Sequence, residues 1–246
     1  MTLESWALHL LKKFLIAFFG NFGNSLTNIL AIETSSDACS VAVSNGKTDY
    51  YFHEIIPKQH TERLLEVIDN LFKTSSIKTE DLNLVAVGNG PGSFTGIRLA
   101  CSTAQGIALS QNIKGVCISS LELLAYKMFK NHSAKRVVSI VDAHMGKIYL
   151  GEFSFIGSEI DNKNLSAVQI ESFNPVKYDE STYFVGPGCE LVEQSISSVS
   201  KHIYSDLPSA EELLELAKEK YEKKEIVIPE QLLPLYLSEE SNWTKS

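Results

Sequence analysis

The sequence is short of basic residues. Among its 246 residues there are 22 lysines and arginines against 30 aspartates and glutamates, which gives a formal net charge of −8. Proteins draw most of their affinity for RNA or DNA from Lys and Arg side chains that neutralise phosphates. The chain is therefore not expected to hold nucleic acid by itself, and any role in RNA biology requires a partner that supplies the basic surface.

Cysteine is also scarce, and its pattern excludes two common kinds of site. The four cysteines form no C-x-x-C pair, and their spacing is typical of neither a zinc site nor a disulfide framework. The six histidines include no pair at helical metal spacing, so no metal site is indicated locally. We expect reduced, mostly buried cysteines in a cytoplasmic protein. No intrinsic metal or cofactor is expected.

A long hydrophobic run is missing as well. The N-terminal stretch FLIAFFG (14–20) is far shorter than the ~20 apolar residues that a transmembrane helix needs. Two lysines precede it, as in a secretory signal, but no small-residue cleavage site follows. Two interpretations are favoured, a downstream translation start and an amphipathic helix with one side formed by Trp6, Leu10, Phe14 and Phe18. Residues 1–28 are placed outside the main fold, and no membrane contact is expected.

The chain after Ile29 alternates between predicted strands and helices. ILAIETSSDACSVAV (29–43) predicts a β-hairpin, and a third strand at 49–56 ends at Pro57. Thr61 is the predicted N-cap of an amphipathic helix at 60–73. Further elements are a buried strand at 84–88, a helix rich in small residues at 97–110, a strand at 115–119 and a helix opened by the capping box of Ser119 and Glu122.

The second half repeats the strand, polar turn and strand of the first. VVSIVDAHMGKIYLGEF (137–153) places Asp142 where Glu33 stands in the first hairpin. Such duplicated hairpins are typical of the actin, sugar-kinase and Hsp70 superfamily, which predicts an N-terminal lobe at 29–132 and a C-terminal lobe at 133–246. Further predictions are strands near 167–174, 182–186 and 201–204, a short helix at 189–197, and a helix at 209–224 with a capping box at Ser209 and Glu212.

Two polar segments are candidates for chemistry. The loop GNGPGSFTG (88–96) joins a strand to a helix, where backbone N–H groups and the helix dipole favour an anion. Its glycine spacing matches neither the Walker nor the dinucleotide pattern, so a tight structural turn is the alternative. Glu33, Thr34, Ser35 and Asp37 could likewise lie near phosphates or magnesium, or simply stabilise their turn.

Seven motifs in a fixed order carry a resemblance to a known family. They are ILAIETSSDACSVAV, HTERLLEVI, GNGPGSFTGIRLACSTAQGIAL, SSLELLA, VDAHMGKIYLGEF, VGPG and PLYLSEESNWTK. From about Ile29 to Lys245 the chain resembles the TsaB (YeaZ) family. The resemblance implies an α/β, two-lobed actin/Hsp70-like (ASKHA, ribonuclease H-like) fold with duplicated mixed sheets flanked by helices.

The same resemblance implies a function. Such proteins are non-catalytic subunits that activate threonylcarbamoylation of N6 of the adenosine after the anticodon, in tRNAs reading codons that begin with A. They act by forming a heterodimer with the paralogue TsaD, with TsaE as a further partner. The resemblance also implies that tRNA is reached only through the complex, that ATP or ADP binds only within it, and that the chain can form a homodimer.

The resemblance assigns residues to these roles. TsaD carries two metal-binding histidines, and the matching positions here are Ser120 and Leu124, neither of which ligates a metal usefully. The expected residual nucleotide contacts are Glu33, Thr34, Ser35, Gly92 and Ser93. The expected partner interface consists of His60, Arg63, Leu64, Val67, Ile68, Leu71, Ile97, Ala100, Cys101 and Ala104.

Two alternatives stay open at this point. The chain could be an enzyme, either an ATP-hydrolysing or phosphotransfer member of the superfamily or a metallopeptidase. The apolar stripe could also be ordinary core rather than an interface. A charge at Leu64 or Ile68, or a bulky side chain at Ala104, is expected to abolish the heterodimer without unfolding the chain if the interface hypothesis holds.

Overall fold

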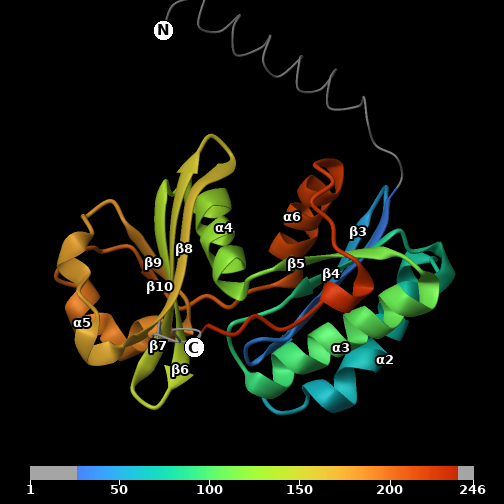
Figure 1. The fold of residues 1–246 in the computed structure, drawn as a ribbon, viewed down its shortest axis with the longest axis horizontal. Helices are drawn as coiled ribbons and strands as arrows, with labels where there is room; N and C mark the ends of the chain where they lie inside the picture. Colours follow the sequence, from blue (N-terminus) through green and yellow to red (C-terminus); the bar gives the residue numbers. More distant parts are fainter. Residues whose placement is uncertain (1–26, 238–246) are drawn as a thin grey trace, which may run out of the picture.

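Two five-stranded mixed sheets form the centre of the molecule. The computed structural model describes residues 27–237, so the interpretations of residues 1–26 lie outside the described part. The first sheet has the order β3-β2-β1-β4-β5 and the second the order β10-β9-β6-β7-β8 (Figure 1). In each, a hairpin is extended by a parallel strand: β1 pairs with β2 and β4, and β6 with β7 and β9. The predicted duplication and the two-lobed α/β fold are confirmed.

The strands, helices and 3₁₀ turns have the following residue ranges, each group in chain order. The first sheet contains β1 (Asn28–Glu33), β2 (Ala38–Asn45), β3 (Asp49–Ile55), β4 (Leu84–Gly88) and β5 (Lys114–Ile118). The second contains β6 (Arg136–His144), β7 (Lys147–Ile156), β8 (Glu159–Gln169), β9 (Tyr183–Val185) and β10 (Ile203–Tyr204). The helices are α2 (His60–Ser75), α3 (Phe94–Gln111), α4 (Ser120–His132), α5 (Glu193–Ile196) and α6 (Ala210–Glu222). Short 3₁₀ turns lie at Thr79–Asp81, Ile170–Ser172, Pro175–Lys177, Pro187–Val192 and Pro229–Gln231.

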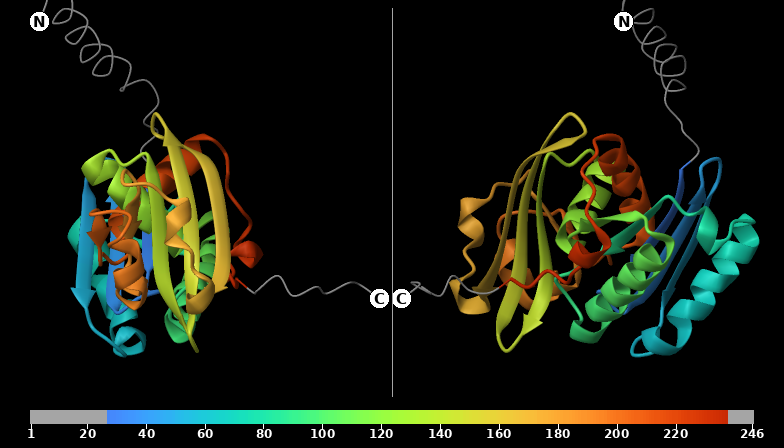
Figure 2. Two further views of the ribbon diagram at one scale, coloured as in Figure 1. Left: turned by 90° about the vertical axis from the view of Figure 1, so that its left-hand side faces the viewer. Right: turned by 45° about the vertical axis from the view of Figure 1, so that its right-hand side comes forward.

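The elements stack in five layers (Figures 1 and 2). Helices α2 and α3 cover the outer face of the first sheet, and α6 covers its inner face. Helix α4 packs on the inner face of the second sheet, whose outer face is covered by the 3₁₀ turn Pro187–Val192 and α5. Strand β1 is apolar on both faces because both are covered by helices. Leu30 faces α2 and α3 and Ala31 faces α6, and both side chains are fully buried, as expected for a central strand.

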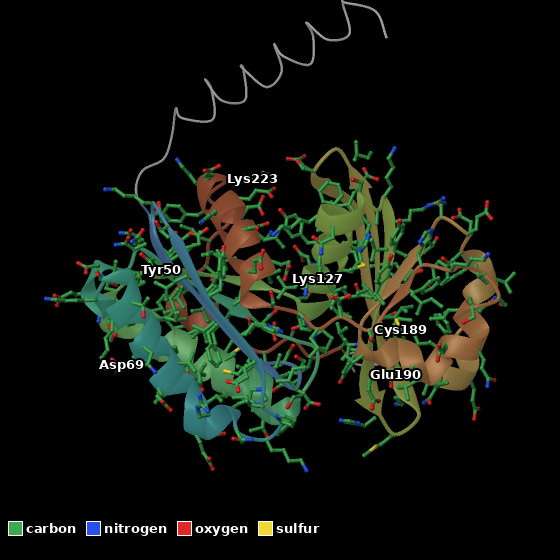
Figure 3. The ribbon with its side chains drawn as sticks, turned by 180° about the vertical axis from the view of Figure 1, so that it is seen from behind. Tyr50, Asp69, Lys127, Cys189, Glu190 and Lys223 are labelled. Atoms are coloured by element: carbon green, nitrogen blue, oxygen red, sulfur yellow. The ribbon has the colours of Figure 1, made fainter. Side chains whose placement is uncertain are left out.

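Ion pairs hold the two inner helices together. Lys130 of α4 binds the carboxylates of Glu211 and Glu215 of α6, at 2.8 and 2.6 Å. Lys127, which lies between the two halves of the molecule in Figure 3, donates to the carbonyl oxygen of Leu207 at 3.0 Å. At the far end of α6, Lys223 binds Glu159 of β8 at 2.8 Å. The lobes are thus joined by charged contacts as well as by the chain.

Some predicted boundaries were wrong. Helix α2 begins at His60, not after Thr61, and its N-cap Gln59 makes no side-chain capping bond. Helix α3 begins earlier than predicted because the side chain of Ser93 accepts a hydrogen bond from the backbone N–H of Gly96. The strand predicted at 167–174 is instead β8, which ends at Gln169. Its half-exposed edge position explains why its sequence shows little apolar alternation.

The C-terminal part returns to the first sheet. Helix α6 packs on β1 and β2, and Val227 then forms a two-bond backbone bridge with Gly115, at 3.0 and 2.8 Å. Farther on, the side chain of Leu232 is 1% exposed in the core beneath α3. All strands of the first sheet precede residue 132 and all strands of the second follow it, while the segment 210–235 packs on the first sheet.

Candidate functional site

The glycine-rich loop is shaped by its crossing over the β1–β2 turn. The backbone N–H of Ser93 donates to the carbonyl oxygen of Ser35 at 2.7 Å, and the hydroxyl of Thr34 donates to the carbonyl oxygen of Gly96 at 2.8 Å. A Cβ on Gly92 would lie 2.2 Å from the Ser35 carbonyl oxygen, well inside contact distance. Close backbone approach therefore explains the glycines here, which favours the structural-turn interpretation of the loop.

Glu33 lies under this crossing as a buried acid. Its Oε1 accepts from the backbone N–H of Ser35 at 2.5 Å, and its Oε2 accepts from the Ser120 hydroxyl at 3.0 Å. The side chain is fully buried, and burial raises its pKa to about 7. A Cβ on Gly88 would lie 1.8 Å from the Glu33 Oε2. The carboxyl group is thus enclosed by Ser35, Gly88 and Ser120 and is not exposed at the surface.

The predicted nucleotide contacts divide into two groups. A cavity of about 700 Å³ lies between the lobes, and Ser35, Gly92 and Ser93 line it. Glu33 and Thr34 do not line the cavity, because their side chains are fully buried. Their contact with a nucleotide stays a prediction. Sequence reasoning missed several other lining residues, which come from both lobes: Ser36, Lys58, Thr61, Val141, His144, Pro187, Leu207 and Pro208.

Most residues predicted to contact a partner belong to the chain's own core. Seven of them belong to the core between α2, α3 and the first sheet: Leu64, Val67, Ile68, Leu71, Ala100, Cys101 and Ala104. His60 and Ile97 are also buried, at 9% and 3% exposed. Arg63 is the exception, with a side chain 38% exposed that pairs with Glu66 at 3.4 Å. The apolar stripe that suggested an interface is the face that each amphipathic helix presents to the sheet. This burial is what the ordinary-core alternative expects, and the partner interface itself stays a prediction.

The opposite faces of the same helices carry exposed apolar side chains. Phe94, at the start of α3, is 67% exposed, and Leu65 of α2 is 65% exposed. A groove of about 570 Å³ runs from Thr61 and Phe94 along α3 to the C-terminal segment, where Tyr236 is 57% exposed. The Arg98 guanidinium carbon lies 3.1 Å from the centroid of the Phe94 ring and 5.2 Å from that of Tyr236. We call Thr61, Leu65, Phe94, Arg98 and Tyr236 the α2–α3 surface.

The two positions matched to metal-binding histidines are used for packing. Ser120 is fully buried and its hydroxyl is committed to Glu33, while Leu124 is fully buried against the second sheet. Within residues 27–237, no cluster of three or more His, Cys, Asp or Glu side chains could hold a metal ion. In the same range, no helix is long and apolar enough to cross a membrane. The described cysteines are free thiols.

Comparison with known proteins identifies the family. The chain is 31% identical over 227 residues to the tRNA threonylcarbamoyladenosine biosynthesis protein TsaB of Escherichia coli, which covers 88% of this chain and 97% of that protein. The chain belongs to the TsaB family. The family model described as TsaD, tRNA N6-adenosine threonylcarbamoyltransferase, also matches residues 52–239.

Further proteins of the family are similar to this chain in sequence or structure over most of its length. The TsaB of Bacillus subtilis is 28% identical over 179 residues, covering 70% of this chain and 76% of that protein. The solved structure of YeaZ from Pseudomonas aeruginosa superposes with a TM-score of 0.76 at 30% identity, covering 85% of this chain and all of that one. The likeness thus extends across both lobes.

Proposed function

We propose that this chain acts in tRNA threonylcarbamoyladenosine biosynthesis as a non-catalytic subunit that pairs with TsaD through the α2–α3 surface. Membership of the TsaB family supports the pathway, which is named in each TsaB relative cited above. The exposed apolar side chains of α2 and α3 are the observation that supports a protein partner. The net charge of −8 supports a role in which tRNA is bound by the complex rather than by this chain.

The proposal of a non-catalytic role draws on what the key side chains do. The buried hydroxyl of Ser120, at the start of α4, donates to the buried carboxylate of Glu33, at the end of β1, so neither group is exposed to a substrate. Leu124 fills the space beside the second sheet. Catalysis requires groups within hydrogen-bond reach of the reacting atoms. In this chain the side chains at the matching positions instead stabilise the fold, which suits a subunit that supports a catalytic partner.

The α2–α3 surface has the chemistry of a protein interface. Aromatic residues and arginine are enriched at the centres of such interfaces, and here Arg98 lies over Phe94 and near Tyr236. Leu65 extends the apolar area one helical turn beyond Thr61. No partner chain is needed to keep these side chains in place, because α2 and α3 are fixed by their buried faces. The surface is therefore preformed for docking.

A pull-down of TsaD tests the surface. Leu65→Glu and Phe94→Glu place charges on exposed positions, so the chain should fold normally and lose TsaD. Val176→Glu is the matched control, because Val176 is 78% exposed on a 3₁₀ turn of the second lobe. TsaD retained by the folded Leu65→Glu, Phe94→Glu double variant would rule this surface out. Gel filtration of the same variants shows whether a homodimer uses the same surface.

Reconstitution tests the subunit role. Threonylcarbamoylation of tRNA should require this chain together with TsaD, and the chain alone should transfer nothing. The Phe94→Glu variant should fail to support the reaction, whereas Val176→Glu should support it fully. Transfer by the purified chain without TsaD would show that the chain is itself a catalyst.

A further inference from the structure

The tip of the β6–β7 hairpin has an uncommon sequence for its conformation. Only two residues, Met145 and Gly146, connect the strands, because His144 pairs with Lys147. The φ angles of Met145 and Gly146 are 52° and 75°, and positive φ at both central residues is the mark of a type I′ turn. Such turns favour Asn-Gly, since asparagine adopts the left-handed region more readily than a bulky side chain does. The turn by itself therefore does not explain the methionine.

Two other hairpins of the molecule have the residues that their turns favour. Gly157 and Ser158 connect β7 to β8, and the positive φ of 62° falls on the glycine. Between β2 and β3 the positive φ of 77° falls on Gly46. Of these three connections, the β6–β7 tip is the one that places a bulky side chain in the left-handed region. A conformation that is unfavourable for its residue is a reason to look for a function there.

The tip is held from both sides, and its methionine faces outward. One carboxylate oxygen of Asp142 accepts from the backbone N–H of His144 at 2.7 Å, and the other lies 3.2 Å from the His144 Nδ1. On the opposite side, the carbonyl oxygen of Gly146 accepts from the backbone N–H of Ile170 at 2.9 Å. Met145 is 95% exposed. Because the backbone beneath it is already fixed, the turn loses little conformational freedom when a partner covers Met145.

The tip is continuous with the α2–α3 surface. In Figure 1 the β6–β7 turn and the starts of α2 and α3 lie along the lower edge of the molecule. The cavity between the lobes is lined by Thr61 and Phe94 from the first lobe and by His144, next to Met145, from the second. Thr61 and Phe94 also line the groove along α3. A partner that covers the α2–α3 surface is therefore within reach of Met145 across the mouth of the cavity.

The α2–α3 surface needs such an extension. A stable interface buries about 800 Å² on each partner, and a large aromatic side chain supplies at most about 150–250 Å². Leu65, Phe94 and Tyr236, each already partly covered, supply only part of that area. Methionine suits the remainder, because its flexible and polarisable side chain fits irregular apolar pockets and is enriched at protein interfaces.

We propose that Met145 is a second anchor for TsaD, inserted into an apolar pocket of that partner beside the contact made by the α2–α3 surface. This inference rests on the proposed function and extends its interface from the first lobe to the second. A partner held by both lobes also fixes their relative position, which a contact with α2 and α3 alone does not.

Met145→Asn tests the proposal, because stability and binding should change in opposite directions. Asparagine suits the turn, so the midpoint of urea unfolding should rise. The affinity for TsaD, measured by titration with the full-length variant, should fall about tenfold because an interface anchor is lost. If Met145 has only a structural role, stability should rise with no loss of affinity. That result would overturn the proposal.

Two further variants are controls for this titration. Met145→Leu keeps an apolar side chain at the tip and should retain most of the affinity for TsaD. Ile156 is 69% exposed at the opposite end of β7, so Ile156→Asn should leave the affinity unchanged. Equal weakening by Met145→Asn and Ile156→Asn would show a general effect of lost apolar surface and would contradict a specific anchor.

The same titration separates this inference from the proposed function. If Phe94→Glu abolishes TsaD binding while Met145→Asn leaves it unchanged, the α2–α3 surface stands and the second anchor is wrong. Full binding by Phe94→Glu would remove the proposed surface, and with it the continuity on which Met145 depends. Gel filtration identifies another occupant. A homodimer weakened by Met145→Asn, with TsaD binding intact, would assign the tip to a second copy of this chain and overturn the proposal.

Discussion

The hydroxyl of Thr34 donates to the carbonyl oxygen of Gly96 at 2.8 Å, and a Cβ on Gly96 would lie 1.9 Å from the carbonyl oxygen of Thr34. The turn after β1 and the first turn of α3 are therefore in direct backbone contact. This contact positions α3, and with α3 it positions Phe94 and Arg98 on the surface proposed for TsaD.

The first prediction compares two glycines of α3. Gly96→Ala should destabilise the chain by several kcal/mol, because backbone must move to admit the new methyl group. Gly106→Ala meets nothing within 4 Å and should stabilise the helix by roughly 0.5–1 kcal/mol. Urea unfolding measures both free energies. Equal stability of the two variants would contradict the close crossing.

The second prediction concerns the pH dependence of stability. Folded Glu33 keeps its proton up to a pKa of about 7, whereas the unfolded carboxyl loses it near 4.5. The folded state thus binds more protons between these values, and its stability should fall as pH rises through that window, by at most about 1.4 kcal/mol per pH unit. Above about pH 7 this contribution should be constant.

Glu33→Gln isolates that contribution. The amide can accept from Ser35 and donate to Ser120 without ever ionising. The unfolding free energy of the variant should therefore fall less steeply with rising pH than that of the unchanged chain. Urea unfolding at several pH values between about 5 and 8 measures it. Glu212, whose pKa is also raised by burial, stays unchanged in both proteins and cancels in the comparison. Identical slopes would mean that Glu33 ionises normally in the folded chain.

The third prediction contrasts neighbouring leucines of α2. Leu64 is fully buried and Leu65 is 65% exposed. Leu64→Ala should cost about 2–5 kcal/mol of unfolding free energy, since it leaves a cavity in the core. Leu65→Ala should change stability by less than about 0.5 kcal/mol and instead weaken TsaD binding. Thermal unfolding and pull-down separate the two effects, and the reverse assignment would overturn the division of the helix into core and partner faces.

The fourth prediction concerns the C-terminal return. Leu232 occupies the space above Gly115, where a Cβ would lie 2.6 Å from its side chain. Leu232→Ala should destabilise the chain by about 2–5 kcal/mol. Leu233→Ala is the neighbouring control, because Leu233 is 56% exposed. A neutral Leu232→Ala variant would show that the segment 226–237 is only loosely attached.

Much of the fold could be predicted from the sequence because its elements have local signals. The β1–β2 hairpin, the helix beginning at Ser119 and the repeat of strand and turn at 137–153 depend on neighbouring residues and were predicted correctly. The return of α6 and residues 226–237 to the first sheet could not be predicted. It is decided by packing between residues far apart in the chain, such as Gly115 and Leu232.

The candidate site shows the same limit. The pattern of α2 identified an apolar face correctly but could not say whether that face meets the sheet or a partner. The residues around the cavity, such as Lys58 and His144, come from separate lobes and carry no shared spacing in sequence. Glu33 was noticed as an acid at a turn, but its burial beneath Gly88 depends on a loop more than fifty residues away. Only contacts between residues far apart in the chain decide whether a side chain is buried in the core, lines the cavity or faces a partner.

The return of residues 226–237 to the first sheet has a consequence for synthesis of the protein. A ribosome makes the strands of the first sheet before those of the second, yet Val227 and Leu232, which complete the first sheet, are made after both sets of strands. The second sheet is formed by one continuous stretch and can close earlier. A nascent chain that stalls before this segment would leave strand β5 uncovered around Gly115. Chaperones should therefore bind such arrested chains most strongly at β5.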